Sequence, residues 1–175
     1  MNICGPFDPN FSDLPDTLPV FPLNGALLLP RGHLPLNIFE PRYLNMIADA
    51  LGQDRMIGMV QPRPDGRNTL HMDPENPPVF QTGCAGRITA FSETDDGRFL
   101  ITLTGVCRFN ITKELPKPDG GYRVVNGDFS PWKEDLSLPS PNMRPINRGR
   151  LRLALDTYFA QNSLQSCWDT LSDTD

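Results

Sequence analysis

Residues 21–47, FPLNGALLLPRGHLPLNIFEPRYLNMI, contain the pattern that decides the fold. Two short apolar runs, residues 26–29 and 34–39, are separated by the turn-forming sequence PRGH at residues 30–33. Apolar runs of this length that are bounded by Pro and Gly are typical of buried strands. The stretch therefore predicts a strand, a turn and a second strand, and a helix follows them.

The segment Glu40-Pro41-Arg42-Tyr43 opens that helix, which we expect at residues 41–51. Pro41 suits the first helical turn because the N–H it lacks would have no partner there. Glu40 can accept hydrogen bonds from the free N–H groups at this positive helix end, or lie beside them. Gly52 is the expected C-cap. Apolar side chains at helical spacing predict the buried face of the helix: Tyr43, Leu44, Ile47, Ala48 and Leu51.

Further short strands are expected on both sides of this stretch, at residues 18–23, 56–61, 79–94, 98–104, 106–115 and 122–129. Pro19 and Pro22 suit an edge strand or a bulge, and Gly58 leaves room for a close neighbour. The sequence TDDG at residues 94–97 is a strong hairpin turn. Six or more short strands that are mostly linked by hairpins predict a closed or partly closed antiparallel barrel.

The composition divides the chain into three parts. Residues 1–13, rich in Pro, Asp and Asn, are expected to form an N-terminal arm, and residues 14–135 the barrel, in which residues 62–78 form a long surface loop. Residues 136–175 are expected to be a linker and the start of a helical subdomain. Helical spacing covers residues 146–161, and a second helix starts at residue 164 just before the chain ends, which predicts a truncated subdomain. The apolar face expected on the first of these helices consists of Leu151, Ala154, Leu155 and Tyr158.

Length and charge limit the function. A chain of 175 residues can bury a sizeable core without disulfides or metals. The net charge of −5 gives no general attraction to nucleic acid or to anionic membranes. The chain starts without the basic and apolar regions of a signal peptide, and no apolar run reaches the ~20 residues of a membrane span. We therefore expect a reduced, cytoplasmic protein.

Motifs for catalysis are missing. The sequence contains no G-x-x-x-x-G-K-[ST], H-E-x-x-H, G-x-S-x-G or G-x-G-x-x-G. Its two histidines, His33 and His71, are expected in a turn and a loop. The four cysteines form no C-x-x-C pair: Cys4, Cys84, Cys107 and Cys167. The strand pattern turns Cys84 and Cys107 inward, where thiols are inert. We expect no catalytic residue, no cofactor and no metal.

A few charged and aromatic residues have two possible interpretations. Glu40 and Arg42 either recognise a ligand or tie the helix to its neighbours, and we favour the structural role. Arg144, Arg148 and Arg152 form either a solvated stripe or a contact for an acidic partner. A polar pocket around Arg42 or Arg87 would indicate an unrecognised enzyme. The aromatic residues of the strands are expected in the core and not on a base-stacking platform: Phe91, Phe99, Phe109 and Phe129.

Several segments, taken together and in order, resemble the substrate-recognition N-terminal domain of the ATP-dependent Lon protease. They are LPVFPL at residues 18–23, LLLP at 27–30, LPL at 34–36, IFEPRY at 38–43, DRMIG at 54–58, GCAGRI at 83–88, and GVCRF at 105–109. The resemblance covers roughly residues 14–133. It implies an α+β, mainly β fold: a PUA-like pseudo-barrel of about six strands with one helix, followed by a helical segment. The ATPase and Ser–Lys protease activities of that family reside in later domains, and the chain resembles the small stand-alone Lon-domain proteins of bacteria.

The resemblance implies a non-enzymatic module that binds unfolded or extended polypeptides, or a protease subunit. An apolar groove or an unpaired strand edge would take such a client by strand addition or side-chain insertion. The alternative, by analogy with PUA-like domains, is RNA binding. The acidic composition and the absence of a basic face with interleaved aromatics argue against it. No catalytic residue is implied, and Glu40, Pro41, Arg42 and Tyr43 are expected to form a structural motif.

Overall fold

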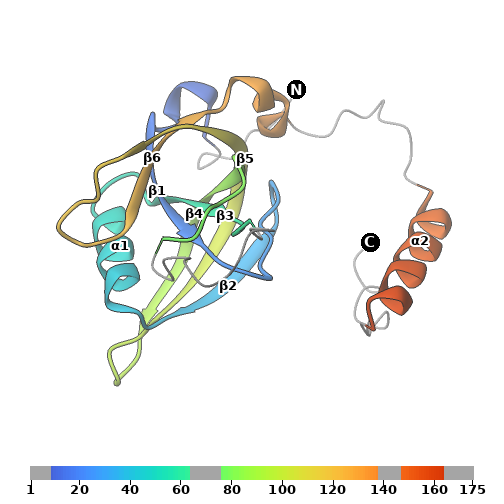
Figure 1. Ribbon diagram of the computed structural model, residues 1–175, viewed down its shortest axis with the longest axis horizontal. Coiled ribbons are helices and arrows are strands. Elements are labelled where there is room, and N and C mark those ends of the chain that lie inside the picture. Colours follow the sequence, from blue (N-terminus) through green and yellow to red (C-terminus); the bar gives the residue numbers. More distant parts are fainter. Residues whose placement is uncertain (1–8, 64–75, 138–146, 164–175) are drawn as a thin grey trace. The chain divides into compact units, whose positions relative to one another are not determined.

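The structure is a computed structural model that describes residues 9–63, 76–137 and 147–163. The chain separates into two compact units, Met1–Leu138 and Pro139–Asp175. The first unit contains all six strands and one helix, and the second contains the C-terminal helix (Figure 1). This arrangement confirms the predicted fold class.

The six strands of the first unit form one mixed sheet, and five of them close into a ring. They are β1 (Thr17–Pro22), β2 (His33–Ile38), β3 (Met56–Val60), β4 (Thr82–Glu93), β5 (Phe99–Leu115) and β6 (Arg123–Asp128). Their order is β2-β5-β4-β3-β1-β6, and a further pairing of β5 with β6 closes the sheet into a ring that leaves β2 outside it. Residues 98–104 and 106–115, predicted as separate strands, are parts of the single long strand β5.

The prediction of an antiparallel barrel is wrong for one pair of strands. β1 runs parallel to β3, whereas the other pairs are antiparallel. Parallel neighbours need a long crossover connection, and residues 23–55, which include β2 and the helix, supply it. β1 also lies inside the sheet order and not at its edge. Its two partners pair with different halves, β6 with residues 17–20 and β3 with residues 20–22, so Pro19 and Pro22 each face one partner only.

The predicted strand at residues 26–29 is absent, and this segment is an irregular loop across β4 and β5. Gly86 of β4 pairs with Gly105 of β5, and the two residues leave a gap beneath the loop. A Cβ atom on Gly105 would overlap the carbonyl oxygen of Leu29, and one on Gly86 would lie 2.6 Å from Leu28 Cδ2. The loop is held there because Arg31 N–H donates to Gly105 O at 2.7 Å. Its backbone therefore follows the surface of the sheet and does not pair as a strand.

The ring of strands closes around Phe109, whose side chain is fully buried. A Cβ atom would lie 2.7 Å from the Phe109 ring at Gly58 of β3, 2.9 Å at Gly83 of β4 and 3.4 Å at Gly127 of β6. The expectation that Gly58 admits a close neighbour is confirmed. Three strands approach one aromatic ring because each of them has a glycine at the point of contact.

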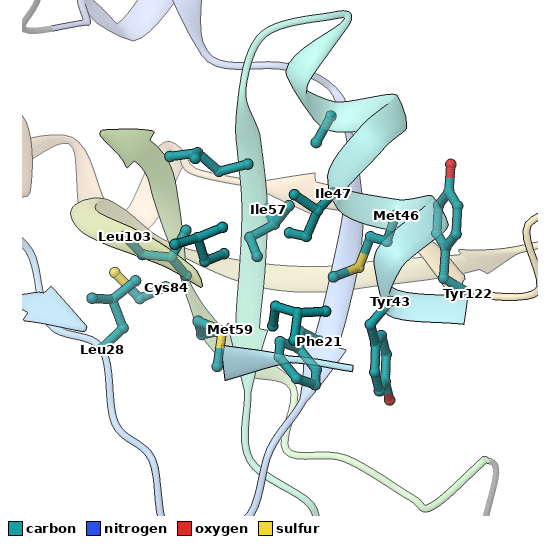
Figure 2. Packing of buried hydrophobic residues seen from close by; sticks show 14 residues of the cluster. Phe21, Leu28, Tyr43, Met46, Ile47, Ile57, Met59, Cys84, Leu103 and Tyr122 are labelled. Carbon is teal, nitrogen blue, oxygen red and sulfur yellow. The ribbon is translucent and has the colours of Figure 1, made fainter. Parts of the chain in front are cut away.

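Helix α1 (Pro41–Leu51) has the predicted bounds, and Gly52 is its C-cap. Its buried residues are Tyr43, Met46, Ile47 and Ala50. Figure 2 shows Met46 and Ile47 directed towards Ile57 of β3. Ala48, which was predicted to be buried, is exposed. The buried face of the helix is thus rotated by about one residue from the predicted face: Met46 and Ala50 are buried in place of Ala48.

Short helices flank the ring. The 3-10 turn η1 (Phe11–Asp13) lies within the predicted N-terminal arm, and η3 (Ser130–Leu136) follows β6. The side chain of Asp135 in η3 binds the Arg108 guanidinium of β5 through bonds of 2.8 and 2.7 Å. The same guanidinium lies 3.9 Å from the centre of the Trp132 ring. These contacts fasten η3 to β5.

In the second unit, α2 (Arg148–Gln161) begins at Asn147, whose side chain accepts a hydrogen bond from Arg150 N–H at 2.9 Å. None of its described residues is buried, including Leu151 and Tyr158 of the predicted apolar face. The predicted helix from residue 164 and the position of Arg144 lie outside the described residues.

The close approach at Gly105 generates a stability prediction. We expect Gly105→Ala to lower the free energy of unfolding by about 3 kcal/mol or more, because its methyl group would overlap backbone that cannot move without displacing the loop. Urea denaturation of the two proteins measures this difference. Gly52→Ala is the control, since its Cβ would have only ordinary contacts, the nearest at 3.5 Å. Equal stability of the two variants would contradict the role given to Gly105.

Candidate functional site

An apolar groove runs along the ribbon formed by β2, β5 and β4. Its volume is about 480 Å³. The register places residue triplets side by side across the three strands, Pro35 with Thr102 and Ala90, and Asn37 with Leu100 and Ser92. All of these residues line the groove. The site is thus a strip of sheet surface that is mostly apolar.

The opposite face of the same ribbon supplies the core. Ile38, Ile101 and Leu103 are buried there, and they belong to the cluster that also contains α1. Because successive side chains of a strand point to opposite faces, burial of this set turns Leu100 and Thr102 outward. Leu100 is 44% exposed. The packing of the core therefore determines which side chains the groove presents.

The β4–β5 hairpin extends past the end of β3, and its tip projects at the bottom of Figure 1. β3 pairs with β4 only as far as Arg87. Phe91 lies beyond this point, is 43% exposed, and makes an edge-to-face contact of 5.0 Å with Phe99. The expectation that Phe91 belongs to the core is wrong for this reason, whereas Phe109 and Phe129 are buried as predicted. The hairpin turn itself is confirmed, with Thr94 N–H donating to Arg98 O at 2.9 Å.

The segment Glu40-Pro41-Arg42-Tyr43 lies where β2 passes into α1. Glu40 is the N-cap residue, but its side chain makes no capping hydrogen bond. It accepts instead from Arg42 Nε and Nη2, at 3.1 and 3.0 Å. The Arg42 guanidinium also lies 4.6 Å from the centre of the Tyr43 ring. The pair therefore forms within the first turn of the helix.

Two tyrosines position α1 against the strands. The Tyr43 ring lies 4.2 Å from that of Phe21, centre to centre, and burial raises its pKa, an effect that Arg42 opposes. Tyr122 donates a 2.7 Å hydrogen bond to Asp49 Oδ2. Burial, followed by this hydrogen bond, raises the pKa of Tyr122 to about 12. Both phenols are protonated at neutral pH, and Figure 2 shows the Tyr43 ring below Met46 and the Tyr122 ring to its right.

The candidate nucleophiles are inert. Cys84 and Cys107 are free and buried, as predicted. Burial raises the pKa of Cys84 to about 12 and that of Cys107 to about 11. His33 is exposed and its Nδ1 lies 3.1 Å from Thr104 Oγ1, while His71 falls outside the described residues. The geometry therefore pairs neither described cysteine with a histidine.

An ion pair that the sequence analysis missed lies between β5 and β6. Arg123 is buried and donates through Nε and Nη2 to the two carboxylate oxygens of Glu114, both at 2.7 Å. Its Nη1 donates to Pro77 O at 2.8 Å. Glu114 and Arg123 flank the turn at residues 116–121, so the hairpin register was the available signal. The Glu114 carboxylate and Pro77 O together bind all three guanidinium nitrogens, which gives Arg123 a structural role.

The described residues can also be searched for a metal site and for a helix that could span a membrane. Within residues 9–63, 76–137 and 147–163, no three metal-ligating side chains come together. Of the helices in those same ranges, none has the length and apolar character to cross a bilayer.

Comparisons with known proteins match this fold and sequence. The family model of the ATP-dependent protease La (LON) substrate-binding domain matches residues 17–159. Lon protease 2 of Myxococcus xanthus is 27% identical over 158 residues, which are 89% of this chain and 19% of that protein. The Lon protease of Parabacteroides distasonis is 31% identical over 123 residues, 69% of this chain and 14% of its own length. The chain thus spans less than one fifth of these relatives.

Two solved structures share the fold. The crystal structure of the Lon N-terminal domain protein from Xanthomonas campestris superimposes with a TM-score of 0.54 at 26% identity, covering 82% of this chain and 73% of that one. The N-terminal domain of the Mycobacterium avium complex Lon protease gives 0.50 at 13% identity, covering 84% and 69%, and shows the fold alone. The resemblance predicted from the sequence is confirmed.

The Glu40–Tyr43 segment remains a predicted structural motif, and its contacts make that testable. We expect Tyr43→Ala to lower the free energy of unfolding by about 3–5 kcal/mol, because the ring is buried against Phe21. Glu40→Gln should cost no more than about 1 kcal/mol, since the ion pair is partly exposed. Thermal and urea unfolding measure both changes. A larger loss for Glu40→Gln than for Tyr43→Ala would show that the ion pair, and not the ring, holds the motif together.

The buried thiols make a second prediction. In a variant that keeps only Cys84 and Cys107, labelling by an alkylating reagent at pH 8 should be about 100-fold slower or more in the folded protein than in urea. Because burial raises both pKa values, the folded state favours the protonated thiols. Their contribution to the free energy of unfolding is complete below the ordinary cysteine pKa of about 8.5 and is lost as the pH rises through about 11–12. Rapid labelling of the folded protein would contradict the burial of these thiols.

Proposed function

The chain belongs to the LON substrate-binding domain family, and we propose that it is a non-enzymatic module that binds extended, apolar polypeptide segments in the groove of the β2–β5–β4 ribbon. The observation that carries this proposal is the groove itself, an open apolar strip of about 480 Å³ that includes the exposed Leu100. Exposed apolar strips of this kind mark interaction surfaces.

The shape of the groove favours an extended chain over a small molecule. A small ligand needs an enclosed cleft that removes most of its surface from water, whereas this groove is a shallow strip of sheet. An extended peptide places every second side chain on one face. The strands below the groove do the same, since Leu100 and Thr102 both face it. Leu100 is 44% exposed, so covering it contributes roughly half of the 1.5–3 kcal/mol that burial of a fully exposed leucine gives. A few such contacts give a weak and reversible complex.

The chemistry of the described residues supports a binding role without catalysis. The two described cysteines are protonated and buried. The guanidiniums of Arg108 and Arg123 are each occupied by a carboxylate. As part of the same proposal, the clients are unfolded polypeptides or subunits of a protease, and the protein works in the cytoplasm. The free thiols of Cys84 and Cys107 fit a reducing compartment.

The charges near the groove favour polypeptide over RNA. At the hairpin tip the described charged residues are Glu93, Asp95, Asp96 and Arg98, an acidic excess that would repel phosphates. We therefore do not propose RNA binding.

Binding of a chemically unfolded protein and of its folded form tests this function. Fluorescence anisotropy with a labelled client should show binding of the unfolded form only, and Leu100→Asp should weaken it about tenfold, because the change places a charge in the apolar strip. Leu27→Asp is the matched control, since Leu27 is 69% exposed but lies outside the groove. Equal failure to bind both forms would refute the function, and a loss caused only by Leu27→Asp would move the site to the loop at residues 26–29.

A further inference from the structure

The free edge of β4 is the remaining feature beside the groove, and it sharpens the proposed function, on which this inference rests. We propose that the client adds as a further β-strand to the outer edge of β4, where it bonds to the backbone of Phe91 and Glu93, and that segments carrying a basic residue are preferred. The client is thus an extended apolar peptide with a Lys or Arg that reaches the hairpin tip.

Hydrogen bonding at the hairpin determines which backbone groups of β4 are available. Thr94 N–H donates to Arg98 O at 2.9 Å, so Thr94 faces β5. Along an antiparallel ladder, alternate residues direct both backbone groups to the same side. Ser92 therefore also faces β5, while Phe91 and Glu93 direct their N–H and C=O groups to the opposite side.

Among the described residues, no strand occupies that opposite side. The pairing of β3 with β4 ends at Met56 and Arg87. The next amide, Ile88 N–H, donates to Arg55 O at 2.8 Å. Beyond it the edge at Phe91 and Glu93 lies past Met56, the first residue of β3. These two residues offer two donors and two acceptors in the geometry of a strand.

The other edge of the ribbon, on β2, is less suited to strand addition. Gly105 N–H donates to Gly32 O at 2.8 Å, so Gly32 faces β5. The same alternation then turns His33, Pro35 and Asn37 outward. Pro35 has no N–H, and an outward proline is a common means of preventing pairing at an edge strand. Over the described part of the ribbon, β4 is therefore the edge free of proline.

Side chains next to the β4 edge indicate the chemistry of the client. The half-exposed ring of Phe91 lies on the edge strand itself. Asp96 is paired with Arg98 at 2.7 Å, and its pKa is lowered to about 2 by that contact. Glu93 and Asp95 form no ion pair within the described residues. An added strand therefore ends beside two carboxylates, which favour a cation over an anion.

Matched proline substitutions test the edge. Glu93→Pro removes one outward N–H from β4, and His33→Pro removes one from β2 outside the groove, while neither removes a backbone bond of the existing ladder. We expect Glu93→Pro to raise the Kd of a labelled, extended apolar peptide about threefold to tenfold beyond the effect of Glu93→Gln, which removes only the charge. His33→Pro should leave the Kd unchanged, because His33 lies outside the groove. Equal effects of the two prolines, or of Glu93→Pro and Glu93→Gln, would overturn the inference.

Peptide variants test the same bonds without changing the protein. N-methylation of alternate residues should abolish binding in one register and leave the other unaffected, and a Lys at the end of the peptide should bind more tightly than a Glu, with the difference reduced in Glu93→Gln. Indifference to N-methylation, or a preference for Glu, would overturn the inference. The proposed function is judged separately, because it fails only if unfolded protein does not bind at all.

Discussion

The burial of Phe109 against three glycines is the contact on which the rest of the structure depends. Gly58, Gly83 and Gly127 let β3, β4 and β6 approach one ring, and so the sheet can close. A Cβ atom at Gly58 or Gly83 would overlap the ring and push its strand away from the centre, whereas one at Gly127 would just touch the ring. Because β3 pairs with β4 only as far as Arg87, the part of the β4–β5 hairpin nearest its turn lies beyond the ring. One face of this part packs on the core, and the other face is uncovered. The groove and the free edge are thus consequences of where the ring closes.

Local features of the fold could be predicted from the sequence because neighbouring residues determine them. The proline at the first turn and the glycine after the last turn place α1, and TDDG places the hairpin turn. Non-local features could not be predicted in this way. The loop at residues 26–29 has the composition of a strand, but it packs across Gly86 and Gly105, which lie far along the chain and leave room for it. The parallel pairing of β1 with β3 likewise depends on a crossover that no short pattern reveals.

The candidate site shows the same division. The strand pattern predicted correctly that Cys84 and Cys107 point inward. It could not show that Phe91 lies beyond the end of β3, since that depends on the lengths of two paired strands. Glu40 and Arg42 were expected to have a structural role, and the guanidinium binds the Glu40 carboxylate within the first turn of the helix. The family resemblance could be recognised in the sequence, whereas the groove could be recognised only in the three-dimensional structure.

The central claim is that extended polypeptide binds along the β2–β5–β4 ribbon. Hydrogen–deuterium exchange of the protein alone and saturated with an unfolded client tests it most directly, because exchange reports every backbone amide at once. The account predicts slower exchange in β4 at Phe91 and Glu93 and in the adjoining part of β5, with α1 and the loop at residues 26–29 unchanged. Protection of α1 or of that loop, with the hairpin unaffected, would contradict it.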